Sequence, residues 1–97
     1  MNKYQVTVTF PAPDSQFMAK VPAHRAYINK LIFRDVIDYY AISAERTGGW
    51  LIMNARSKRE VIEYLEGSPL FDYFDLDIDE LMVYDSAMYR FPKMVLN

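Results

Sequence analysis

The sequence contains no cysteine, and this absence excludes disulfide bonds, thiolate nucleophiles and cysteine-ligated metal sites. It also contains no run of Lys and Arg, and its net charge is −2. Because a phosphate backbone is bound by clustered cations, nucleic acid is not expected as a partner. No stretch approaches the roughly 18 apolar residues that a membrane span needs, so no membrane partner is expected either.

Apolar and aromatic side chains are abundant. Of the 97 residues, 52% are hydrophobic and 15% aromatic, a composition far from that of a disordered chain. The length allows one domain, residues 1–97, and the chain shows no internal linker or repeat. Residues 1–10 alternate polar and apolar types and lack the continuous apolar core of a signal peptide, so we expect a cytoplasmic protein.

The amino end predicts a β-strand over residues 3–10, because apolar and polar residues alternate there with a period of two. Pro11 and Pro13 end this strand, since proline cannot donate to a strand ladder. Either Asp14 or Ser15 can then cap a helix.

A first helix is indicated by one apolar stripe at helical spacing. Its members are Phe17, Val21, His24, Ile28 and Leu31. Pro22 interrupts the stripe, so either the main helix begins at this proline or the helix is kinked there. We predict a short turn over residues 15–21, followed by the main helix over residues 22–33.

The middle of the chain predicts a β-hairpin. Residues 36–43 and 50–55 are two strand-like segments that carry apolar side chains on both faces. Residues 44–49 form the turn between them, with two glycines that are free to take positive φ.

A second helix begins with a capping box, in which Ser57 is followed three residues later by Glu60. Gly67 lies where a helix C-terminus favours glycine. Residues 74–84 then alternate apolar residues with aspartates and predict the last strand, and residues 85–97 form a short apolar tail.

The order β-α-β-β-α-β is typical of the ferredoxin-like α+β fold, in which two helices cover one face of a four-stranded antiparallel sheet. The two middle strands nevertheless carry apolar residues on both faces. These residues are Tyr39, Tyr40, Ile42, Trp50, Leu51, Ile52 and Met53. Because an exposed apolar sheet would aggregate, we expect a second copy of the chain to cover it, giving a homodimer onto which residues 85–97 pack.

Two short motifs resemble those of the dimeric α+β barrel superfamily. Residues 22–27, P-A-H-R-A-Y, are similar to the P-x-H-x-x-Y helix of YCII-like proteins. Residues 67–76, G-S-P-L-F-D-Y-F-D-L, are similar to the G-x-P-L-F-x-Y-x-D-I junction of muconolactone isomerases. The resemblance implies a homodimer whose sheets pack face to face, with a pocket in each subunit between the sheet and the helices.

The resemblance also implies a role for His24, which matches the histidine that YCII-like proteins are suspected of using together with an aspartate. That aspartate usually precedes the proline after the second helix, and here the position is Ser68. A serine cannot hold an imidazole as a carboxylate can, so the YCII-type pair is incomplete. Muconolactone isomerases move a proton within a lactone, but only their G-x-P-L-F motif matches this chain.

Several residues are candidates for a site. His24 could act as a general base in a pocket, or it could be a core histidine bonded to a carbonyl or a tyrosine. Asp38 and Asp75 are the nearest acidic candidates, and the alternative is that both are exposed on their strands. Arg46 could meet an anionic ligand or be solvated. The candidate ligand-binding residues are Tyr40, Trp50, Ser68 and Tyr73.

A calcium site is not expected, although Asp75, Asp77 and Asp79 resemble the start of an EF-hand loop. Such a loop needs Gly at its sixth position and Glu at its twelfth, and here these are Glu80 and Ser86. No Ser-His-Asp, metal-ligand or cofactor-binding spacing is present, so we expect neither a metal nor a cofactor.

Three functions remain open from the sequence. The first is a small-molecule enzyme of isomerase- or lyase-like proton-transfer type, acting on a cyclic or carbonyl compound with His24 as base. The second is a non-catalytic dimeric module that binds a ligand or a partner, with His24 structural. The third is an oxygen-dependent monooxygenase of the same fold. Fold does not decide between them, because function depends on the site.

Overall fold

The computed structural model of the chain describes residues 1–86. The elements along the chain are β1 (Asn2–Thr9), α1 (Ser15–Phe33), β2 (Ile37–Ile42), β3 (Gly48–Ala55), α2 (Lys58–Glu66), the short 3₁₀ helix η1 (Phe71–Tyr73) and β4 (Asp75–Leu81). This order confirms the predicted ferredoxin-like α+β fold, and the strand ends differ from the predicted ones by at most three residues, the largest difference being at the end of β4.

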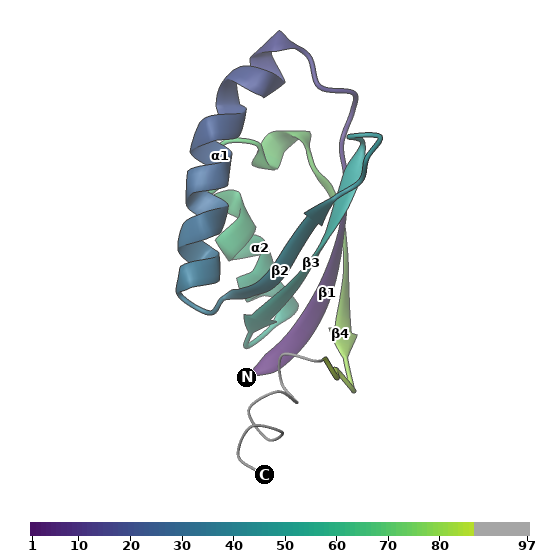
Figure 1. Ribbon diagram of the computed structural model, residues 1–97. Coiled ribbons are helices and arrows are strands. Elements are labelled where there is room, and N and C mark those ends of the chain that lie inside the picture. The colour runs from purple at the N-terminus through teal and green to yellow at the C-terminus, as the bar shows by residue number, and fades with distance from the viewer. Residues whose placement is uncertain (87–97) are drawn as a thin grey trace.

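The four strands form one sheet in the order β2-β3-β1-β4, and each neighbouring pair is antiparallel. Both helices lie on the same face of this sheet, as Figure 1 shows. We call this the helix face, and we call the opposite face, which neither helix covers, the open face. The arrangement follows from the order of elements, because each helix connects strands that are not neighbours in the sheet.

The core lies between the helix face and the two helices. Tyr4, Val6 and Val8 of β1 are buried at alternate positions, as the period of two predicted. Val6 lies between Leu51 of β3 and Ile78 of β4 in the sheet register. The apolar stripe of α1 and the buried residues of α2 pack on these side chains and close the core.

The predicted break at Pro22 is wrong, because α1 runs without interruption from Ser15 to Phe33 with Pro22 inside it. Asp14 is the N-cap, and its carboxylate accepts a hydrogen bond of 2.8 Å from the backbone N–H of Phe17. The Phe17 side chain is buried and stacks on the ring of Phe10 with a centroid distance of 5.3 Å. The cap and this packing hold the turns before Pro22 helical, although proline removes one backbone donor.

At the start of α2, the predicted capping-box contact from Ser57 to the backbone of Glu60 is confirmed, while the Glu60 side chain bonds to Arg56 rather than to Ser57. Ser57 Oγ accepts a hydrogen bond of 3.1 Å from the backbone N–H of Glu60. The Glu60 carboxylate reaches back to Arg56, the residue before the cap, and accepts from its backbone N–H at 3.0 Å. The Ser57 bond satisfies one of the amide groups that the first turn of a helix leaves without partners, and the Glu60 bond fixes the residue before the cap.

The β2–β3 hairpin is confirmed, but its glycines do not use their freedom to take positive φ. No glycine has positive φ, and the turn residue with left-handed backbone is Arg46, whose φ is 63°. Gly48 and Gly49 belong to β3, where a Cβ on Gly49 would collide with the carbonyl oxygen of Ala41 on β2. Close approach of two strands, rather than turn geometry, therefore requires glycine at this position.

Residues 87–97, which hold most of the predicted apolar tail, lie outside the described residues. Within residues 1–86, neither helix has the length and apolar character needed to span a membrane.

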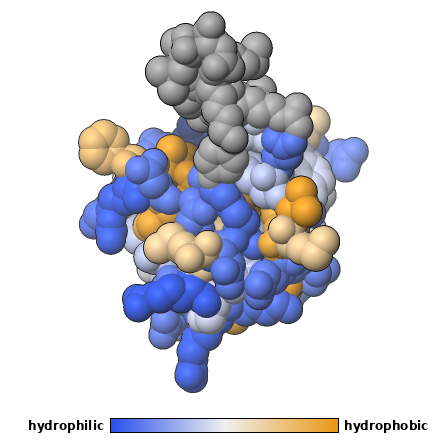
Figure 2. Space-filling model, turned by 90° about the horizontal axis from the view of Figure 1, so that it is seen from below, coloured by the Kyte–Doolittle hydropathy of each residue, from blue (hydrophilic) through white to orange (hydrophobic). Residues whose placement is uncertain are grey.

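Figure 2 shows the end of the molecule where β1 begins, and hydrophobic residues are scattered there among hydrophilic ones.

Candidate functional site

A cavity of about 260 Å³ lies between α1, the helix face of the sheet and the segment that follows α2. Its wall is mostly apolar and aromatic. The aromatic, basic and histidine side chains of the lining include Phe10, His24, Arg25, Tyr40, Arg46 and Phe74. The volume is below the range of about 300–1,000 Å³ that is common for ligand pockets, so it suits a ligand about the size of one substituted ring.

His24 lies in the wall of this cavity with only 4% of its surface exposed. Its Nδ1 lies 2.6 Å from Ser68 Oγ, and its Nε2 lies 2.9 Å from the Tyr40 hydroxyl. The three members of this hydrogen-bonded series come from three parts of the fold: His24 from α1, Tyr40 from β2 and Ser68 from the segment that follows α2. Both ring nitrogens are occupied, so a ligand reaches the imidazole through Tyr40.

The two sequence motifs meet at one contact. Tyr27, one turn beyond His24 on α1, donates a hydrogen bond of 2.6 Å to the backbone carbonyl of Tyr64 on α2. A Cβ on Gly67 would collide with the Tyr27 ring and hydroxyl, so glycine is required here for close approach, at an ordinary φ of −70°. Packing Tyr27 against Gly67 brings the next residue, Ser68, to His24.

Ser68 is itself fixed, because its Oγ accepts a hydrogen bond of 3.0 Å from the backbone N–H of Leu70. A hydroxyl has one proton to give. If Ser68 donates that proton to Nδ1 of His24, then Nε2 carries a proton and donates it to Tyr40. If Ser68 accepts from Nδ1–H instead, Nε2 is an acceptor for the Tyr40 hydroxyl. The serine supports both tautomers, whereas an ionised carboxylate could only accept.

Burial sets the charge states of His24 and Tyr40. Desolvation, with a smaller contribution from the nearby Arg25 guanidinium, lowers the pKa of His24 from 6.5 to about 4. Desolvation also raises the pKa of Tyr40, and the Arg25 charge opposes this only in part. At neutral pH the imidazole is therefore neutral and the phenol protonated, so the pair can pass a proton without first gaining or losing one.

Aromatic rings surround the histidine. The ring of Phe74 meets the imidazole edge to face at a centroid distance of 5.8 Å. Phe10 packs between Phe74 and Phe17, at 6.0 and 5.3 Å. Such pairs favour these tilted and edge-on geometries and give the cavity a rigid apolar wall.

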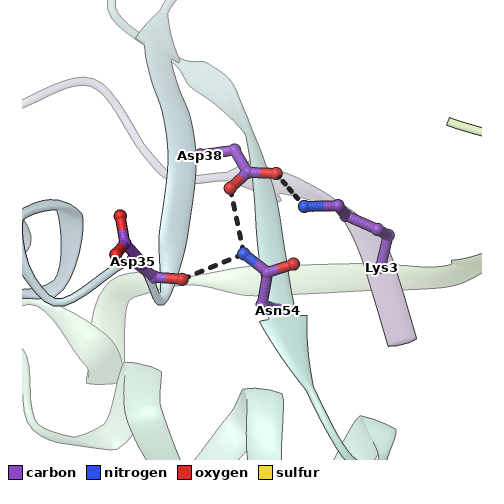
Figure 3. Close-up of polar contacts among 4 residues, drawn as sticks. All are labelled: Lys3, Asp35, Asp38 and Asn54. Atoms are coloured by element: carbon purple, nitrogen blue, oxygen red, sulfur yellow. Dashed lines mark hydrogen bonds and ion pairs between the residues drawn. The ribbon is translucent and has the colours of Figure 1, made fainter. Parts of the chain in front are cut away.

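The two candidate carboxylates do not reach His24, because both lie on the open face. Asp38 of β2 forms an ion pair with Lys3 of β1 and accepts a hydrogen bond of 2.9 Å from the side chain of Asn54 on β3, as Figure 3 shows. Asn54 also donates to the backbone carbonyl of Asp35. Asp75 pairs with Thr9 in the sheet and is exposed. Strand alternation turns both carboxylates away from the helices.

Of the four candidate ligand-binding residues, Tyr40 and Ser68 are brought together at His24, and two others lie elsewhere. Trp50 is on the open face with 43% of its surface exposed. Tyr73 stacks edge-on against Phe17 at 5.1 Å and does not line the cavity. Arg25, which does line it, was not predicted, because it lies outside the apolar stripe that includes His24.

No cluster of three or more His, Asp or Glu side chains that could hold a metal ion exists within residues 1–86. The polar groups that face the cavity are the Tyr40 and His24 pair and the two arginines at its rim. The described part of the site therefore offers proton transfer and anion binding by side chains.

Comparison with known proteins finds likeness in structure only. No family model and no curated protein matches the sequence. The 5-chloro-2-hydroxyhydroquinone dehydrochlorinase TftG of Burkholderia phenoliruptrix AC1100, solved with 2,5-dihydroxybenzoquinone, is similar with a TM-score of 0.61 and 20% identity over 89% of this chain and 97% of that one. A muconolactone isomerase is similar with a TM-score of 0.61 and 21% identity over 89% and 94% of the two chains.

The resemblance read from the motifs is thus confirmed at the level of the fold, over nearly the whole length of both known proteins. The chain has the ferredoxin-like fold that muconolactone isomerase and the dehydrochlorinase share.

Proposed function

We propose that this chain is a small-molecule enzyme that moves a proton within a cyclic or carbonyl compound bound in the cavity beside His24. The observation that carries the proposal is the 2.9 Å contact between Nε2 of His24 and the Tyr40 hydroxyl, at the wall of an otherwise apolar cavity. The two structurally similar proteins are a dehydrochlorinase and an isomerase, which supports a catalytic use of the fold.

The proton path follows from the contacts. In the tautomer with Nδ1–H donating to Ser68, the Tyr40 hydroxyl donates to Nε2. The Tyr40 oxygen takes a proton from the carbon beside a ligand carbonyl while its own proton passes to Nε2, and the C–H electron pair enters the enolate. Return of a proton by the same path to a different carbon gives the isomer and restores the neutral imidazole.

A non-catalytic ligand-binding module is the second candidate, and two observations favour it. Both ring nitrogens of His24 already have partners within the protein, and the pKa of about 4 makes its imidazole a weak base. In that case the hydrogen bonds of His24 to Tyr40 and Ser68 are structural, and they only hold α1 against the sheet and the segment after α2.

Hydrogen–deuterium exchange at carbon separates the two candidates. The protein is mixed in D₂O with muconolactone or cyclohexanone, and the loss of the C–H signals next to the carbonyl is followed by proton NMR. For an enzyme we expect exchange above the buffer rate in at least one compound, and we expect Tyr40→Phe and His24→Asn each to reduce it by about 10²-fold or more.

Tyr39→Phe is the matched control, because Tyr39 is the neighbour of Tyr40 on β2 but faces away from the cavity. It should leave the exchange rate unchanged. Exchange that survives both Tyr40→Phe and His24→Asn would contradict the assigned relay. Saturable binding of these compounds without any exchange would favour the binding module.

We also propose that the protein works as a homodimer joined through the open face. Tyr39 and Trp50 are 42% and 43% exposed there, next to Ala41. Large aromatic side chains that lie together on a sheet face with no helix over it favour a partner surface. The same face carries Lys3 and the aspartates of β4, so the contact would need these charges to be matched across the interface.

Sedimentation at micromolar concentration tests the dimer and should give twice the chain mass of 11.4 kDa. Trp50→Asp should shift the protein to monomer without unfolding it, because Trp50 is half exposed in the single chain. Ile52→Asp is the contrasting variant: Ile52 is only 2% exposed within the chain, so the charge should impair folding itself. A wild-type monomer would overturn the proposal.

A further inference from the structure

Two arginines line the cavity that holds His24, and neither is used by the proton path above. Arg25 follows His24 on α1, and Arg46 lies in the turn between β2 and β3. Both side chains are exposed and both line the cavity, so they lie at its rim. Within residues 1–86 neither forms an ion pair, although Lys3 and Arg56 do.

The Arg25 charge acts inside the cavity. It contributes to the lowered pKa of His24 and opposes the rise in the pKa of Tyr40, so its field reaches both polar groups of the wall. A ligand that touches Tyr40 therefore lies within range of the Arg25 guanidinium as well. An anionic group on that ligand would be attracted to the rim while its apolar part faces the ring of Phe74.

Arg46 is held in a backbone conformation that arginine rarely adopts. Its φ is 63°, in the left-handed region that favours glycine or asparagine, although Gly48 and Gly49 follow closely along the chain. The turn is fixed by hydrogen bonds from the Arg46 N–H to the Ser43 carbonyl at 3.0 Å and from the Ser43 N–H to the Gly48 carbonyl at 2.8 Å. Strain of this kind concentrates at functional sites, and here it presents a cation to the cavity.

We propose that Arg25 and Arg46 form an anion clamp at the rim of the cavity, and that its ligand is a small ring compound carrying one carboxylate. A planar guanidinium matches a carboxylate through two parallel hydrogen bonds, and the apolar wall accepts the ring. This inference rests on the proposed function only in placing the ligand in the same cavity, and it names the substrate class for that site.

Binding can be measured without any turnover, because His24 is the single histidine and its ring protons give resolved NMR signals. Three probes are titrated at pH 7: benzoate, its neutral counterpart benzamide, and inorganic phosphate. Benzoate should shift the His24 signals with an affinity about tenfold or more above that of benzamide. Phosphate should bind more weakly than benzoate, since it gains nothing from the apolar wall.

Matched variants then assign the preference to the two arginines. Arg25→Gln and Arg46→Gln should each weaken benzoate binding about tenfold and leave benzamide binding unchanged. Arg59→Gln removes an equal charge from the exposed surface of α2, away from the cavity, and should change neither. Since all three side chains are exposed, the variants should fold, and their melting temperatures check this.

Equal affinity for benzoate and benzamide, or no binding of either probe, would overturn the clamp. So would a benzoate preference that survives both Arg25→Gln and Arg46→Gln. Phosphate that binds as tightly as benzoate would overturn the ring-carboxylate class. None of these outcomes depends on exchange at carbon, so the clamp and the proton relay can fail separately.

Discussion

The low pKa of His24 predicts a specific dependence of stability on pH. The imidazole titrates near pH 4 in the folded chain and near 6.5 when it is unfolded. Between these values the unfolded state binds more protons than the folded state, so the free energy of unfolding must rise with pH. The contribution is complete above about pH 7 and is lost as the pH falls toward 4.

The magnitude follows from the same two values. Between pH 7 and pH 5 the linkage relation gives a loss of up to about 2 kcal/mol from this one group. For a chain of this size, that is a large part of a total stability of about 5–10 kcal/mol.

Urea unfolding at fixed protein concentration measures the effect at pH 7, 6 and 5. His24→Asn is the reference, since it removes the only imidazole while every carboxylate remains. The difference in free energy between the two proteins should shrink by about 2 kcal/mol from pH 7 to pH 5. Parallel curves, or a His24 pKa of 6.5 or above by NMR, would refute the reasoning.

Three further variants test the contacts around the site. Gly67→Ala should lower the free energy of unfolding by about 1–3 kcal/mol in urea, because its Cβ would collide with Tyr27. The loss should be smaller in a Tyr27→Ala background, and additive effects of the two substitutions on the free energy would contradict the contact. Ser57→Ala should lower the free energy of unfolding by about 1 kcal/mol in the same assay, because it removes the N-cap of α2. An unchanged urea midpoint would show that the cap does not stabilise the protein. Ser68→Asp should raise the pKa of His24 measured by NMR, because an adjacent carboxylate stabilises imidazolium; an unchanged pKa would mean that Ser68 does not face Nδ1.

The local elements of the fold could be predicted because their signals are local. Alternation over residues 3–10 fixed the first strand, and Ser57 with Glu60 marked the start of α2. The helical turns before Pro22 could not be predicted in the same way. Their stability comes from Phe17, which packs against Phe10 and Tyr73, and the sequence alone does not show which rings meet.

The candidate site was predictable in part. His24 stood out as the single histidine on an apolar stripe, and Ser68 stood out by its place in a motif. That these two residues touch depends on the packing of Tyr27 against Gly67, which are 40 positions apart in the chain and meet only when both helices lie on the same face of the sheet. The motifs indicated the participants, and the tertiary contact supplied their geometry.

The partner of His24 on the sheet depends on a single shift of register in β2. Ile37 pairs with Met53 of β3, but Tyr39 pairs with Ile52, so Asp38 is an extra residue on its strand, as at a β-bulge. Simple alternation from Ile37 would have turned Tyr39 to the helices; the shift turns Tyr40 there instead. The Asp38 side chain, held by Lys3 on the open face, stabilises this shifted register. Asp38 was one of two acidic candidates for a contact with the imidazole, and its position instead makes it a residue that selects which tyrosine meets His24.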